Sequence, residues 1–111
     1  MAFQEKQLGQ HRINNTTATS LYSPAAGVTA VIKAVLVCNQ SGAAATFRIF
    51  VDDNGTTFDE TTALYWDVTI AADTTVQIDT FWAMNDSTGN LATRTSVANA
   101  LTFTAFGAEI T

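Results

Sequence analysis

The sequence has few of the residue types that carry most enzyme chemistry. Its 111 residues include one His, one Cys and five Lys plus Arg. A single Cys cannot form an intrachain disulfide, and small domains of oxidising compartments usually contain several, so we expect synthesis in a reducing cytosol. General bases, metal ligands and phosphate-binding groups are equally scarce. We therefore expect a binding or structural protein that is not an enzyme and uses no cofactor or metal.

Charge is scarce as well. Charged residues make up 14% of the chain, against about 25% in ordinary soluble domains. The net charge is −5, and the five cations are scattered along the sequence. Because binding to a nucleic-acid backbone needs several cations on one face, we expect no nucleic-acid partner. No apolar run is long enough to span a bilayer and the N-terminus lacks a continuous apolar signal segment, so we expect no membrane association.

What the sequence does contain is a succession of short apolar runs with alternating side chains, separated by turn residues. The runs predict strands over residues 16–22, 28–39, 45–51, 64–70, 74–84, 91–95 and 101–110, with a further short one at 7–13. Seven or eight strands without a helical pattern predict an all-β fold. We expect an antiparallel two-sheet β-sandwich of the jelly-roll or Greek-key type.

The length fits a single domain with one core. Residues 1–15 are polar and show no clear periodicity, so we assign them to an N-terminal arm. Residues 16–111 then form the β-sandwich domain.

The alternation also predicts which side chains face the core. In residues 28–39 both faces are apolar, with Val31, Val35 and Val37 on one side and Cys38 on the other. This pattern favours a strand covered on both faces, with Cys38 as a small buried hydrophobe.

Two later segments carry most of the large aromatic residues. In residues 64–70, Leu64 and Trp66 are predicted to face inward and Tyr65 to face water. In residues 74–84, two adjacent aromatics, Phe81 and Trp82, predict a β-bulge at which the strand changes face.

The acidic segment Asp-Asp-Asn-Gly at residues 52–55 resembles part of a calcium-binding loop. The EF-hand spacing fails, because aligning Gly55 with the invariant glycine puts Phe50 at the first ligand position and Thr61 at the bidentate one. We prefer an exposed hairpin turn, and a metal site of another geometry is the alternative.

The sequence offers few residues for catalysis and several aromatics for sugar binding. His11 is the one candidate general base, but no Gly-x-Ser-x-Gly elbow is present and a triad needs three groups in contact. Tyr65, Trp66, Phe81 and Trp82 could form a platform for a sugar ring. A carbohydrate-binding module that uses Tyr65 or Trp82 is therefore an alternative from a different functional class.

Several segments resemble small virion structural proteins of tailed bacteriophages. The resemblance lies in residues 20–33, 37–42, 45–50, 53–58 and 67–72. It implies a non-enzymatic β-sandwich that serves as a capsid decoration or cement subunit. A neck, tail or fibre subunit is the alternative within the same class.

The resemblance also implies partners and a location. We expect the arm to contact the major capsid protein or another virion protein, and the chain to form a homo-oligomer. A trimer is favoured because cyclic symmetry hides strand edges between copies. The location is then the virion, after synthesis in the bacterial host cytoplasm. The residues expected to contact the partner are Phe3, Gln7, Leu8, His11, Arg12 and Ile13.

Overall fold

The computed structural model describes residues 2–85 and 87–111. Met1, in the predicted arm, and Asp86, in a predicted loop, lie outside the described residues. Nowhere in the described chain does a helix reach the length and hydrophobicity that a membrane span requires. The strands are β1 (Phe3–Arg12), β2 (Thr19–Tyr22), β3 (Thr29–Asn39), β4 (Ala45–Asp52), β5 (Ala63–Ile70), β6 (Thr74–Asn85), β7 (Asn90–Thr95) and β8 (Leu101–Ile110).

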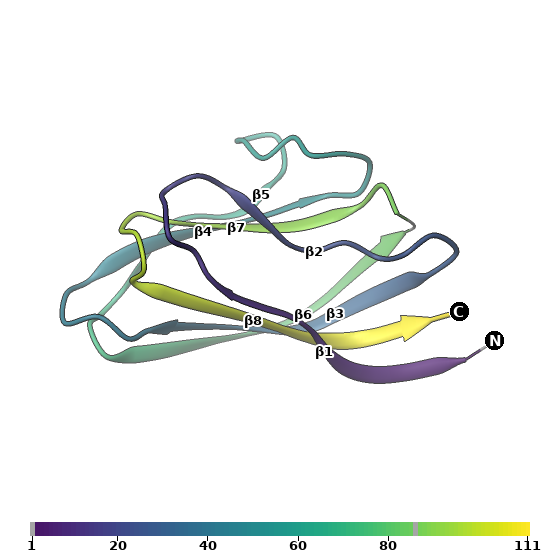
Figure 1. Cartoon of the computed structure of the whole chain (residues 1–111), viewed down its shortest axis with the longest axis horizontal. Helices are drawn as coiled ribbons and strands as arrows, with labels where there is room; N and C mark the ends of the chain where they lie inside the picture. Colours follow the sequence, from purple (N-terminus) through teal and green to yellow (C-terminus); the bar gives the residue numbers. More distant parts are fainter. Residues whose placement is uncertain (1, 86) are drawn as a thin grey trace.

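The strands form two four-stranded antiparallel sheets that pack face to face (Figure 1). The first sheet has the order β1-β8-β3-β6, and the second has the order β2-β7-β4-β5. Successive strands cross from one sheet to the other, except between β4 and β5, which are neighbours. This interleaving is the jelly-roll topology. The predicted fold class is confirmed.

The core lies between the two sheets and is filled by aliphatic and aromatic side chains from both. Phe47 of the second sheet meets Phe103 of the first edge to face, with ring centroids 6.3 Å apart and planes at 74°. Aromatic pairs favour this geometry because the positive ring edge meets the negative ring face. The largest fully buried side chains are Phe47, Phe50, Phe103, Ile32, Ile49, Ile70, Leu91, Leu101, Val35 and Val37.

The predicted N-terminal arm is largely a strand, so this assignment is corrected. Strand β1 pairs with β8 from Phe3 opposite Ile110 to Arg12 opposite Thr102. The sandwich therefore begins near residue 3 and not at residue 16. The alternation is missing from the sequence because β1 is an edge strand whose side chains are mostly exposed on both faces. Figure 1 shows the two chain ends side by side at one end of the sandwich.

The prediction that residues 28–39 form a strand covered on both faces is half right. Val35, Val37 and Ile32 are buried in the core, but Val31, which the alternation puts on the same side as Val35 and Val37, points outward to a partly exposed face. The cause is a register shift between Ile32 and Ala34, present against both β6 and β8. A bulge of this kind adds one residue and exchanges the two faces of the strand.

Cys38 is half-buried and lies on the outer side of β3, opposite Thr102 and Thr75. The prediction that it is a buried core residue is therefore wrong. Cys38 follows Val37, and Val37 faces the core, so alternation turns the thiol outward.

Strand β5 also reverses the predicted facing. Tyr65 points inward and packs on Phe47 with ring centroids 6.3 Å apart, whereas Leu64 and Trp66 are 47% and 40% exposed. The predicted core positions of Leu64 and Trp66 are therefore wrong. Asp67 has a φ of 51°, and the pairing of β5 with β4 shifts register here. The inward and outward alternation of side chains that holds from Val68 onward is therefore reversed before Asp67, at Trp66 and Tyr65.

Candidate assembly surface

The outer side of the first sheet carries apolar side chains on all four of its strands. Strand register identifies its side chains: Phe106 lies opposite both Gln7 and Ala34, and Phe3 lies opposite Ile110. We call this surface the aromatic face. Its apolar side chains are Phe3, Val31, Ala34, Leu36, Phe81, Ala83, Phe106 and Ile110.

Three aromatic rings on this face are open to solvent. Phe81 is 78% exposed, Phe3 is 60% exposed and Phe106 is 39% exposed. A soluble monomer seldom leaves a continuous apolar patch uncovered, and such patches mark sites of interaction. Interface centres are rich in aromatic residues and poor in charge. The aromatic face therefore has the composition of a protein interface.

Phe81 owes its position to the predicted bulge in β6, which is confirmed. Asp79 and Trp82 have partners on β3, but Thr80 and Phe81 lie between these pairs and have none in the register. The Thr80 hydroxyl donates a hydrogen bond to the Ile32 carbonyl. Trp82 turns inward against the core, so Phe81 points out from the aromatic face.

The charged groups near these rings are paired. Lys33 lies at the bulge of β3. Its Nζ is 2.8 Å from Oε2 of Glu5 and 5.4 Å from the centroid of the Phe3 ring. Both contacts reach across β8 to β1. The ammonium group is thus neutralised by a carboxylate and stacked on an aromatic ring. The pair adds no net charge to the aromatic face.

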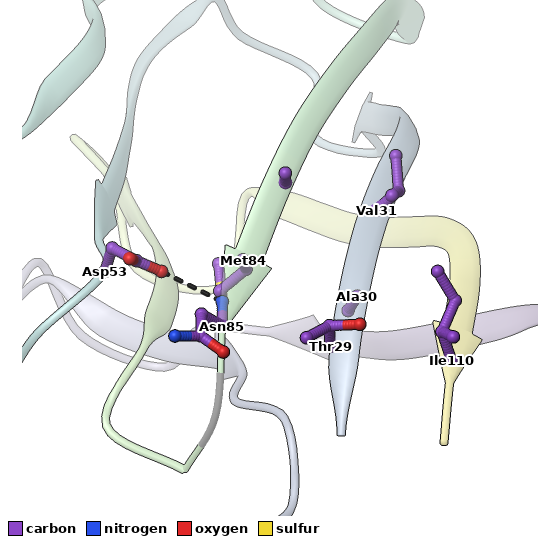
Figure 2. A pocket seen from close by; sticks show the side chains of 8 residues that line it. Thr29, Ala30, Val31, Asp53, Met84, Asn85 and Ile110 are labelled. Carbon is purple, nitrogen blue, oxygen red and sulfur yellow. Dashed lines mark hydrogen bonds between the residues drawn. The ribbon is translucent and has the colours of Figure 1, made fainter. Parts of the chain in front are cut away.

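A hollow of about 350 Å³ lies at one end of this face, where β6 ends and β3 begins (Figure 2). Ala83, Val31 and Ile110 contribute outward-facing apolar side chains from three adjacent strands. Asp53 borders the hollow, and its Oδ1 accepts a hydrogen bond of 2.9 Å from the Asn85 backbone N–H. We call this cavity the β6 hollow. Its complete lining is Thr29, Ala30, Val31, Asp53, Ala83, Met84, Asn85 and Ile110.

The six residues predicted to contact a partner fall into three groups. Phe3, Gln7 and Arg12 are exposed, Leu8 and His11 are half-buried, and Ile13 is 4% exposed within the core. Ile13 cannot meet a partner in the folded protein, so that assignment is corrected. Ile13 follows β1 directly and packs in the core, so a hydrophobic residue in this polar segment does not indicate an exposed anchor.

His11 links the two sheets. Its Nε2 lies 2.8 Å from the Thr93 hydroxyl on β7, and its ring meets Phe103 edge to face with centroids 5.9 Å apart. Burial lowers the pKa of the imidazole below 6.5. These contacts give His11 a structural role between the sheets.

The predicted sugar platform is divided among three environments, of which Phe81 on the aromatic face is one. Tyr65 and Trp82 pack on each other and on the core, with ring centroids 6.1 Å apart. Trp66 lies on the outer side of the second sheet, where the Arg48 guanidinium carbon is 3.5 Å from its ring centroid. A sugar needs an open ring face, and Arg48 occupies one face of Trp66.

The acidic segment after β4 folds as a capped turn. The Asp52 carboxylate accepts hydrogen bonds from the backbone N–H groups of Asn54 at 3.0 Å and Thr57 at 2.9 Å. Within residues 2–85 and 87–111, no group of three or more His, Cys, Asp or Glu side chains is placed to hold a metal ion. Asp52 thus closes the loop between β4 and β5, as short polar side chains commonly do in turns.

No family model matches the chain, and no curated protein matches it. A chain in the structure of infectious bursal disease virus, Gx strain, aligns with 98% of this protein at 16% identity and a TM-score of 0.52. A chain in the structure of the Gt strain aligns with 97% at 14% identity and a TM-score of 0.44. The protein spans 32% and 29% of those chains, about a third of their length. At these identities the likeness to the Gx chain shows the fold: an eight-stranded jelly roll like one found in an animal virus.

Proposed function

We propose that this protein is a structural subunit of a virion. The observation that carries the proposal is the jelly-roll strand order of the two sheets. Nearly the whole length of this protein aligns with part of a chain in a virus structure. The bacteriophage resemblance of the sequence supports a narrower form. In that form the chain is a capsid decoration or cement protein, without enzymatic activity, that binds and stabilises the head shell.

The rigid sandwich and its uncovered surfaces suit such a role. A cement subunit works by contact, so it needs a core that holds its shape and surfaces that remain available after folding. The interdigitated core between the sheets supplies the first, and the aromatic face and the free edge of β1 supply the second.

We place the shell contact at the edge of β1. Ala2 and Thr111 exchange two backbone hydrogen bonds, of 3.1 Å and 2.9 Å. In an antiparallel sheet, hydrogen-bonded residue pairs alternate with pairs that are not hydrogen-bonded. The register of β1 against β8 is unbroken from Phe3 to Gln7. The backbone N–H and C=O groups of Phe3, Glu5 and Gln7 therefore point away from β8. An extended segment of a capsid subunit can add to this edge as a further strand.

The test compares two substitutions at Gln7 in binding to particles stripped of the protein. Gln7→Pro removes an outward N–H, which an edge strand tolerates, whereas Gln7→Thr keeps it. We expect wild type and Gln7→Thr to cosediment with particles and Gln7→Pro to lose most binding. Circular dichroism and thermal melting confirm that both variants fold.

Two outcomes would count against the proposal. Binding of Gln7→Pro at the wild-type level would remove the β1 edge as the contact, and failure of the wild type to bind any particle would overturn the virion role. Electron microscopy of labelled protein separates a head position from a neck, tail or fibre position.

A further inference from the structure

The aromatic face carries both a projecting aromatic ring and a hollow lined mainly by apolar residues. Phe81 projects from the bulge of β6, and the β6 hollow begins at Ala83, two residues further along the same strand. We propose that two copies of this chain pair through their aromatic faces, with Phe81 of each copy inserted into the β6 hollow of the other. This self-association is separate from the shell contact proposed at the edge of β1.

The positions of ring and hollow allow the contact to be reciprocal. Residues two apart on one face of a strand are separated by about 7 Å, and the hollow continues from Ala83 across Val31 to Ile110. A two-fold axis in the plane of the contact, midway between Phe81 and the hollow, brings each ring over the partner's hollow. One operation then satisfies both copies, as in an isologous dimer.

The chemistry of the hollow fits an aromatic side chain. Its volume of about 350 Å³ lies just above the ~300 Å³ at which small-ligand pockets begin. Val31, Ile110 and Ala83 offer aliphatic contacts to an aromatic ring. Insertion would remove from water a Phe81 ring that is 78% exposed in the single chain.

The charges of the face permit two copies to meet. The chain carries −5 overall, but the aromatic face together with Asp53 at the rim of the β6 hollow carries only −1. Glu5 and Lys33 form an ion pair, while Asp79, opposite Ala34, and Arg12, opposite Thr102, add one charge of each sign. Repulsion between copies is therefore weaker across this face than the net charge suggests.

The area also favours a second copy as the occupant. Four strands about 4.8 Å apart and about ten residues long present roughly 600 Å². A stable interface buries about 800 Å² of accessible surface on each partner, more than this flat area, so the contact must use the whole face together with its projecting side chains. The matching surface must be equally extended and equally low in net charge, and the aromatic face of another copy has these properties. The sequence favoured a trimer, whereas a ring and a hollow on one face are satisfied by a pair.

The decisive experiment measures solution mass against concentration by sedimentation equilibrium, without particles. We expect a dimer for the wild type. Phe81→Ala should weaken it by about 100-fold or more, because an interface aromatic is commonly worth a factor of tens and symmetry removes two rings. Ala83→Phe, which fills the hollow, should weaken it as well. Leu64→Ala is the matched control, since Leu64 is 47% exposed on the other sheet, and it should leave the mass unchanged.

Mixing the two variants tests the reciprocal geometry. Phe81→Ala keeps the hollow and Ala83→Phe keeps the ring, so a mixed pair has one intact contact and should associate more tightly than either variant alone. A monomer at all concentrations, a trimer, a dimer unaffected by Phe81→Ala, or no gain in association on mixing would overturn the inference. None of these readouts involves particles, so their failure is distinguishable from failure of the proposed virion role.

Discussion

Each outer face of the sandwich carries large aromatic side chains, but these side chains differ in how far other parts of the chain cover them. On the second sheet, Phe50 points away from the main core yet is 1% exposed, because Phe58 and Trp66 pack on it at 6.1 Å and 6.2 Å between ring centroids. On the first sheet, Phe81 is 78% exposed. The loop between β4 and β5 supplies Phe58, which together with Trp66 covers Phe50 from within the chain. Phe81 remains exposed to solvent.

Charge is also arranged differently on the two faces. On the second sheet, Arg48 and Arg94 lie directly opposite each other, and Asp67 bridges them at 2.6 Å and 3.6 Å. The Arg48 guanidinium lowers the pKa of the Asp67 carboxyl. Like charges opposite each other destabilise a sheet, so Asp67 offsets a local cost. On the first sheet the ion pair Lys33–Glu5 lies over a solvent-exposed ring instead.

The largest expected contrast is between phenylalanines on the two faces. Phe50→Ala should lower the free energy of unfolding by about 3–5 kcal/mol, because it leaves a cavity beneath Phe58 and Trp66. Phe81→Ala should change the stability of the single chain by no more than about 0.5 kcal/mol, because its ring is already in water. Urea unfolding at low protein concentration measures both. Equal losses would contradict the distinction between a covered and an open face.

A smaller effect is expected for the cation on the covered face. Arg48→Ala removes a guanidinium stacked 3.5 Å from the Trp66 ring centroid, which is worth about 0.5–1 kcal/mol at an exposed site. Trp66 fluorescence should shift as its ring gains contact with water, and Arg48→Lys should restore the interaction only in part. An unchanged emission spectrum with unchanged stability would show that the stack does not persist in solution.

The smallest effect concerns pH and the junction between the sheets. Burial lowers the folded-state pKa of His11 below its ordinary value of 6.5, so the unfolded chain binds a proton more readily. Stability from this residue is therefore present above pH 6.5 and is lost as the pH falls below 6.5 toward the folded-state pKa. Unfolding of wild type and His11→Gln across this range should differ in slope. Identical pH profiles would remove this contribution.

Sequence alternation predicted most strands because their inward side chains are apolar at every second position. It failed for β1, where an edge strand with two exposed faces shows no alternation. Alternation also failed beyond bulges. The register shifts near Ile32 and Asp67 turn the following side chains to the opposite face of the strand, and the sequence of one strand does not reveal where such a shift occurs.

The candidate surface was only partly accessible from sequence. Phe3 was among the predicted contact residues, but Phe106 was not. The β6 hollow could not be predicted, because it joins side chains from β3, β6 and β8 with a loop residue, Asp53. Its only signal in the sequence was the Phe81–Trp82 pair that indicated the bulge.

The most direct measurement of the central claim is quantitative mass spectrometry of virus particles purified on a density gradient from cells that make this protein. The account predicts that the chain comigrates with the particles and is present in many copies per particle, in a fixed ratio to the main shell protein. Its absence from intact particles, or a trace amount that varies between preparations, would contradict a structural role in the virion.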